Sequence, residues 1–175
     1  MVTLTATRDR HAAARGGAPG SAVDHPFFGQ VGDNRRVRRV RAAAAGAVAA
    51  AVWAAQEPLD QCVFGHDYSD VAVLGKLLTR GPEWRRAGLA FHVANGAVFG
   101  LVYDAARRRL DVDSRRLAVG MALGEHLVLF PLGALVDRHH PARGEPGLAS
   151  LLSGRAFAQA TWRHALFGWV LGRLA

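Results

Sequence analysis

A short pattern, HxxxGxxxG, occurs twice in this chain, each time inside a largely apolar stretch about twenty residues long, the length of a membrane-crossing helix. It covers residues 92–100 and recurs at residues 164–172, 72 positions later. Glycines four positions apart lie on one face of a helix, and in lipid such a face lets two helix backbones pack closely. The pattern therefore predicts helix packing through Gly96, Gly100, Gly168 and Gly172.

Charged residues are segregated along the chain, so values averaged over the whole sequence do not reveal the apolar segments. They make up 21% of the sequence and the mean hydropathy is only +0.07, values that also suit a soluble domain. Eight of the 22 Lys and Arg residues precede Ala42, and five lie between Arg107 and Arg116. Long runs with little charge separate these basic blocks, and such runs favour a membrane protein.

Four segments have the composition of membrane-crossing helices. The second and third have the roughly twenty apolar residues that a bilayer requires, whereas the first is short and Ala-rich and the last carries polar side chains. We therefore predict an all-α fold, an integral membrane four-helix bundle over residues 38–175. Its helices are expected at residues 42–57, 87–105, 117–136 and 156–174.

Two other interpretations fit part of this pattern. A soluble Ala-rich bundle would need a polar stripe on each surface helix, and residues 87–105 and 117–136 lack one. A secretory signal over residues 35–55 would lie unusually far from the N-terminus. The membrane interpretation is favoured over both.

The basic residues divide unequally between the two sides that four spans would create. With a cytoplasmic N-terminus, both basic blocks and Arg173 fall on the cytoplasmic side, against seven Lys or Arg residues in the opposite loops. The positive-inside rule then predicts a multi-pass protein with both termini in the cytoplasm. The Ala- and Arg-rich composition is typical of a GC-rich bacterium, so we expect the plasma (inner) membrane of a bacterium.

The expected partners follow from the same charges. Juxtamembrane arginines attract anionic lipid headgroups, which together with the lipid bilayer explains a pI of about 11.2. Nucleic acid is not expected, because no aromatic-interleaved basic patch or DNA-binding motif accompanies the charge. Whether copies of the chain form a homo-oligomer stays open.

Two segments outside the predicted spans have distinct characters. Residues 1–37 are rich in Ala, Gly and Arg without a sustained period, which predicts a disordered basic cytoplasmic tail. In the first outer loop, Ser69 or Asp70 can cap a short helix over residues 69–80. We expect this helix to lie at the outer surface of the membrane that the protein spans.

The two copies of the pattern raise the question of an internal repeat. Pro58 precedes His92 by 34 positions, and Pro131 precedes His164 by 33. Each half would contain a helix, an outer loop and a second helix, so the bundle would consist of two parallel helix-loop-helix repeats. Few residues match, and chance agreement explains them equally well.

Several polar side chains fall at membrane depth. At about 1.5 Å per residue, His92 lies ~8 Å and His164 ~12 Å below the outer ends of their helices. Such groups are costly in hydrocarbon and normally face the bundle interior or a wet cavity. The candidate cluster comprises Glu57, His92, Asn95, Glu125, His126, Arg163 and His164.

Three roles for this cluster stay open. It can serve packing alone, with Glu125 and Arg163 as a buried ion pair and the histidines bonded across helices. It can form a proton or ion relay, or line a substrate cavity. A haem between His92 and His164 is coherent with ligation in helix bundles, but only the two histidines support it, so no cofactor is expected. A metal site is not expected either, because HExxH is absent and Cys62 is the single cysteine.

With these residues in view, the chain from about Arg38 onward resembles the YagU-like family of small bacterial inner-membrane proteins. In that family the second and last helices also tend to carry a His followed by Gly-x-x-x-Gly, and an acidic residue follows the first span. The resemblance implies four spans and a plasma-membrane location. It supplies no catalytic residue for transfer to this sequence.

These observations favour a non-enzymatic membrane component, structural or partner-binding. The alternative is a small transporter-like or redox module that uses the outer-half cluster of His, Glu and Arg side chains. The sequence indicates no catalytic residue, and it identifies neither a substrate nor a partner.

Overall fold

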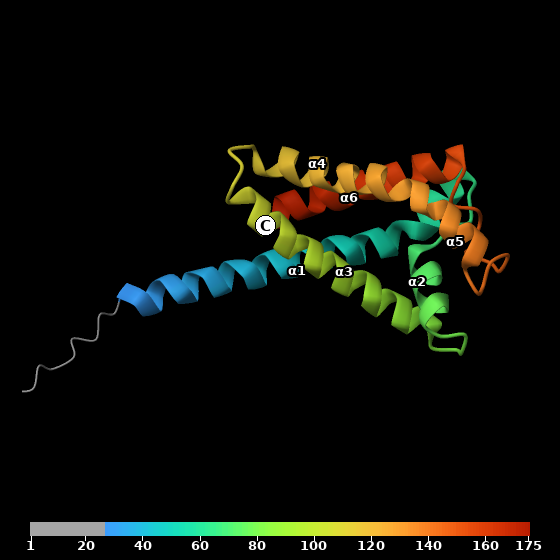
Figure 1. Ribbon diagram of the computed structural model, residues 1–175, viewed down its shortest axis with the longest axis horizontal. Coiled ribbons are helices and arrows are strands. Elements are labelled where there is room, and N and C mark those ends of the chain that lie inside the picture. Colours follow the sequence, from blue (N-terminus) through green and yellow to red (C-terminus); the bar gives the residue numbers. More distant parts are fainter. Residues whose placement is uncertain (1–26) are drawn as a thin grey trace, which may run out of the picture.

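The computed structural model describes residues 27–175, which are built of helices and contain no strand. In chain order these are α1 (Phe27–Phe64), α2 (Asp70–Leu78), α3 (Trp84–Arg107), α4 (Ser114–Leu129), the short 3-10 helix η1 (Phe130–Leu132), α5 (Gly133–His139) and α6 (Gly154–Leu174). Figure 1 shows the long helices side by side, with α2 and α5 together at the end away from the C-terminus. The prediction of an all-α fold is confirmed.

The first helix is much longer than the sequence predicts. It contains 38 residues, or about 57 Å at 1.5 Å per residue, against an expected helix over residues 42–57. Residues 27–37, assigned by the sequence to a disordered tail, form its first turns, and the remainder of that tail, residues 1–26, lies outside the described residues. At its other end α1 continues past Pro58, because ion pairs from another helix hold Glu57 and Asp60 in its last turns.

Glycines bring α3 onto α1 at close range. A Cβ atom built on Gly46 of α1 would lie 2.0 Å from the Gly96 carbonyl oxygen of α3. One on Gly100 would lie 2.1 Å from the carbonyl oxygen of Ala42. Since no real Cβ approaches a backbone atom so closely, only glycine permits this crossing.

The second copy of the pattern lies at a second close crossing, between α6 and α4. A Cβ on Gly168 would lie 2.6 Å from the Val119 Cα atom, and one on Gly172 would lie 2.9 Å from the Arg115 Cα atom. The glycines of α3 thus lie against α1, and those of α6 lie against α4, which is the first long helix of the second half of the chain. This arrangement agrees with an internal repeat, which stays a prediction.

The short helix expected in the first outer loop is α2, and the Ser69 hydroxyl caps it by accepting a hydrogen bond from the Ala72 backbone N–H at 3.1 Å. It packs on α3 through another glycine pair, because a Cβ on Gly75 would lie 2.0 Å from the Trp84 carbonyl oxygen. A Cβ on Gly88 would likewise clash with the backbone of α2. Sequence analysis did not identify this third crossing.

The segment expected at residues 117–136 is divided into three helical pieces. Pro131 lies in η1, which joins α4 to α5. By length and composition, two helical segments of the described chain could cross a membrane: Trp84–Arg107, which is α3, and Ser114–His139, which runs from α4 through α5. The helices α1 and α6 are long enough but less apolar.

The glycine crossings give a first prediction, with a control on the neighbouring helix. Gly100→Ala should lower the free energy of unfolding by roughly 1–3 kcal/mol, because the added methyl group meets the Ala42 backbone. Gly120 of α4 has open space at its Cβ position, so Gly120→Ala should leave stability unchanged or raise it by up to about 1 kcal/mol through helix propensity. Unfolding in detergent, followed by circular dichroism, measures both variants, and equal effects would contradict the packing role.

Candidate functional site

The side chain of Arg163, on α6, is fully buried among carboxylates. Its Nε and one terminal nitrogen each donate to a different oxygen of Asp60, on α1, at 2.6 Å. The other terminal nitrogen donates to Asp70, at the start of α2, at 2.9 Å. The guanidinium also donates to the Tyr68 carbonyl oxygen at 2.9 Å. One side chain therefore joins three parts of the fold that are distant in sequence.

Two further groups complete this ion network. The carboxylate of Glu57, on α1, lies 3.8 Å from the guanidinium and accepts hydrogen bonds from the Ser69 hydroxyl at 2.5 Å and the Asp70 backbone N–H at 2.9 Å. The amide of Gln159, buried on α6, donates to Asp60 at 2.6 Å. One guanidinium thus faces three carboxyl groups, and the network carries more acidic than basic side chains.

Asp70 connects the ion network to the aromatic side chains beside it. Its carboxylate accepts hydrogen bonds from the Trp53 indole N–H at 2.8 Å and from the Tyr68 hydroxyl. Burial alone would raise the pKa of Asp70. The positive charge of Arg163 and other neighbouring groups have the larger effect, so the pKa is lowered from its usual value. Burial and the nearby Asp70 carboxylate raise the pKa of the Tyr68 phenol well above its usual value, so Tyr68 remains a hydrogen-bond donor.

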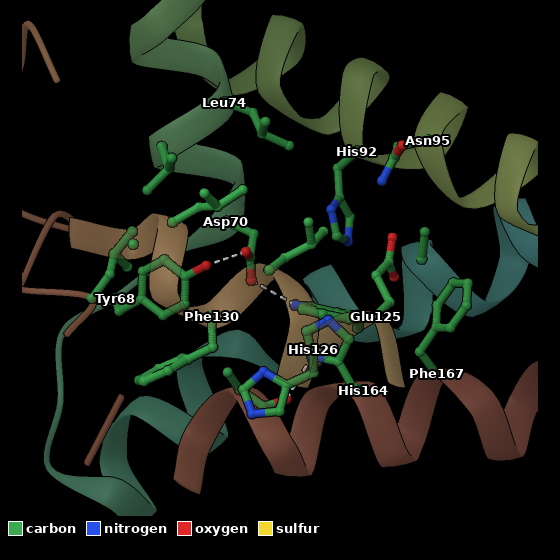
Figure 2. Close-up of a pocket in the computed structure, with 18 of the residues that line it drawn as sticks. Tyr68, Asp70, Leu74, His92, Asn95, Glu125, His126, Phe130, His164 and Phe167 are labelled. Carbon is green, nitrogen blue, oxygen red and sulfur yellow. Dashed lines mark hydrogen bonds between the residues drawn. The ribbon is translucent and has the colours of Figure 1, made fainter. Parts of the chain in front are cut away.

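A cavity of about 380 Å³ adjoins Asp70 and is lined by residues from every helix of the described chain. Its lining is mostly apolar and aromatic, with Trp53 from α1, Phe99 from α3, Phe130 from η1 and Phe167 from α6. Figure 2 shows the polar side chains that point into the same space. Among them, Asp70 is contributed by the ion network, and three histidines and one glutamate come from α3, α4 and α6.

The three histidines of the cavity have different environments. His92, on α3, is only 8% exposed, and its buried Nε2 atom has no hydrogen-bond partner. The His164 Nδ1 lies 2.7 Å from the carbonyl oxygen of Ala160 in its own helix. The His126 Nε2 lies 3.0 Å from the hydroxyl of Thr161 on α6. Of these three imidazoles, only that of His92 has a buried ring nitrogen that lacks a partner among the described residues.

Aromatic contacts fix where these rings lie. The Trp53 indole packs edge-to-face against His92, with ring centroids 5.3 Å apart, and against His164, with centroids 4.6 Å apart. The His126 and His164 rings are tilted by 32° at a centroid distance of 4.9 Å. The packing interpretation had expected the histidines to bond across helices. Instead they pack on aromatic rings and form no hydrogen bond to one another.

Glu125, on α4, lies on the opposite side of the cavity from the ion network. Its side chain is half-buried and points toward His92 and Asn95 (Figure 2). None of the ion pairs formed within residues 34–175 involves it. The expected pair of Glu125 with Arg163 is therefore wrong, because Asp60, Asp70 and Glu57 surround that guanidinium instead.

The cavity has exposed lining residues on α3 and on the contiguous helices α4 and η1, so it is open to the surface between them. Figure 1 shows the backbones of α3 and α4 diverging from the turn between them. Lining residues on both sides of this gap are exposed: Asn95 on α3, Leu129 on α4 and Leu132 in η1. Since two of these three are leucines, the rim of the opening is largely apolar.

The structure brings together most of the residues singled out by sequence. His92, Asn95, Glu125, His126 and His164 line one cavity, whereas Glu57 and Arg163 belong to the adjacent ion network. Within the described residues, no group of three or more His, Cys, Asp and Glu side chains is arranged to hold a metal ion. Both histidines considered as haem ligands pack on Trp53.

Sequence reasoning missed Asp60, Asp70 and Trp53. Asp60 lies one turn after Glu57, beyond the helix expected over residues 42–57. Asp70 was interpreted only as a helix cap. The useful signal was Arg163 itself, because a buried guanidinium requires carboxylate partners, and residues 56–70 contain Glu57, Asp60, Asp67 and Asp70.

Comparisons of the chain with protein-family models, with curated proteins and with solved structures gave no match.

The ion network gives a second prediction. Arg163→Gln should lower the free energy of unfolding by roughly 3–5 kcal/mol, because it leaves buried carboxylates without a counter-charge. Arg155→Gln, at an exposed position of the same helix, should cost less than about 1 kcal/mol. The double variant Asp60→Asn with Arg163→Gln should lose less than the two single losses together. Additive losses in a thermal-unfolding series would contradict direct coupling.

Proposed function

We propose that this chain is a four-span, non-enzymatic protein of the bacterial plasma membrane, and that its cavity binds a small, mostly apolar molecule taken up from the bilayer. The spans are α1, α3, the segment from α4 to α5, and α6. The observation that carries the proposal is the cavity itself, which opens through an apolar rim between two helices whose outer faces are apolar.

Exposure of α3 and α4 supports a membrane location. Only 28% of the most apolar stretch of α3 and 17% of that in Ser114–His139 is buried within the chain. The core helix of a soluble protein would be mostly buried. Val98 on α3 is 57% exposed and Val128 on α4 is 73% exposed, and lipid would cover both side chains.

The lower hydropathy of α6 has an explanation compatible with a span. Its strongly polar side chains Gln159 and Arg163 are fully buried and paired inside the bundle, so they lower the average without facing lipid. On its outer face, Trp162 and Trp169 are about half-exposed. In α1 the small side chains of the Ala-rich stretch reduce hydropathy, while Val48 and Val52 face outward.

The charge distribution supports an orientation. The basic residues at the start of α1, the end of α3 and the start of α4 are grouped at the end of the bundle that contains the C-terminus (Figure 1). By the positive-inside rule this end is cytoplasmic, and its arginines would contact anionic lipid headgroups.

Binding agrees better with the cavity chemistry than does a proton relay. Binding sites for small molecules are mostly apolar with a few polar groups that orient the ligand, and this cavity has aromatic surfaces beside His92, Asn95 and Glu125. A relay needs hydrogen bonds from one titratable group to the next. Here His164 is bonded within its own helix and His126 to Thr161, so the histidines are not linked in series.

Filling the cavity provides the third prediction. Ala160 of α6 lines the cavity, so Ala160→Phe should abolish the binding of 4-phenylbutan-1-ol to protein in lipid nanodiscs. Ala158 lies one position before Gln159 on the same helix but is exposed, and Ala158→Phe should leave binding unchanged. Equilibrium dialysis, with uptake by empty nanodiscs subtracted, measures both. Unchanged binding by the Ala160 variant would overturn the proposed site.

A further inference from the structure

We propose that the cavity selects an organic primary amine in its protonated form, with the ammonium group between Glu125 and His92 and an apolar tail among the aromatic side chains. This inference rests on the proposed function, since it names the class of molecule that the same cavity binds. Three independent features of the site point to this class: an unpaired carboxyl group, an unpartnered imidazole nitrogen and a lining of aromatic rings.

Glu125 is the acid that has no counter-charge. The single guanidinium beside the cavity is already bonded to Asp60 and Asp70, with Glu57 close by. Glu125, on the other side of the cavity, forms no ion pair with any side chain of residues 34–175. A half-buried carboxylate of this kind is stabilised by a cation that arrives with the ligand.

His92 supplies a second point of recognition. Its side chain lines the cavity and is 92% buried, since 8% is exposed, and its Nε2 atom has no hydrogen-bond partner among the described residues. An unsatisfied buried nitrogen is costly, and a ligand that hydrogen-bonds to it removes this cost. When the imidazole carries its proton on Nδ1, Nε2 is an acceptor, which fits an ammonium N–H. A quaternary ammonium group has no such hydrogen.

The side chains of Glu125, His92 and Asn95 all line the cavity, the first from α4 and the other two from α3 (Figure 2). The Asn95 amide adds a neutral polar group to this lining. An ammonium group has three N–H donors, so it can bond to the Glu125 carboxylate and to other acceptors of the lining at the same time. A hydroxyl group has only one hydrogen to donate and no charge to offset that of the carboxylate.

The apolar lining fits the rest of such a molecule. Phe167 (Figure 2), Trp53 and Phe99 line the same cavity as Glu125. Aromatic faces attract cations as well as apolar groups. A dry cavity of about 150 Å³ is large enough for benzene, and the present one measures about 380 Å³. A phenylalkyl tail therefore fits inside, with the leucine-rimmed opening between α3 and α4 as its entrance.

The same charges disfavour an anionic ligand. The carboxylates of Asp70 and Glu125 both border the cavity, and the guanidinium nearest to it faces more carboxyl groups than it can neutralise. A carboxylate or phosphate inside the cavity would be repelled at short range in a medium of low dielectric constant. Charge complementarity thus selects the cation.

A matched pair of probes tests the inference. The probes are 4-phenylbutylamine, which is protonated at pH 7, and 4-phenylbutan-1-ol, which has the same length and no charge. Both are dialysed against the protein in nanodiscs of neutral lipid. We expect the amine to bind about tenfold or more tightly than the alcohol, the scale of charge-assisted hydrogen bonds. Glu125→Gln should remove most of this preference and still bind the alcohol, which shows that the variant retains its cavity.

The control is Glu83→Gln, the same substitution at an exposed site before α3, which should keep the full preference for the amine. His92→Leu should reduce amine binding while leaving alcohol binding intact. Equal binding of both probes by the unmodified protein would overturn the inference but leave the proposed function standing, provided that Ala160→Phe still abolishes alcohol binding. If neither probe binds, the proposed function fails and the inference fails with it.

Discussion

The buried guanidinium of Arg163 is the interaction on which the rest of the fold depends. A charge buried at this position is costly, and here a two-point contact with Asp60 and a second contact with Asp70 offset that cost. These contacts join α6 to the last turns of α1 and to the start of α2. They also fix Asp70 against Trp53, which forms one side of the cavity.

The cavity results from how the two ends of the bundle are held. Near the turn between α3 and α4, glycines bring α3 onto α1 and α6 onto α4 with almost no space between backbones. At the other end, polar side chains hold α1, α2 and α6 together, and α3 is held by α2. The helices α3 and α4 diverge from the turn that connects them (Figure 1), and the cavity lies between residues of both. The site is thus a consequence of the packing and needs no specialised loop.

Local patterns in the sequence predict the helices and most of the polar side chains of the cavity. Apolar length, the Ser69 cap and the glycine spacing depend on neighbours within a few turns, so they are visible without a structure. The partners of Arg163 cannot be identified from such local patterns, because they depend on how α1 and α2 lie against α6. The continuation of α1 past Pro58 has a related cause, because tertiary ion pairs stabilise the turns that follow it. The division of the third segment at η1 was likewise not evident from hydropathy.

The central claim is that lipid covers the outer faces of all four long segments. Single nitroxide labels at Val52, Val98, Val128 and Trp169, in a Cys62→Ser background, test it directly in reconstituted bilayers, since these positions lie on α1, α3, α4 and α6 and face outward. Collision rates with oxygen and with a water-soluble nickel complex are compared at each site. The account predicts frequent collisions with oxygen and few with nickel at all four labels. Ready access of the nickel complex at all four would show a water-exposed bundle and contradict the account.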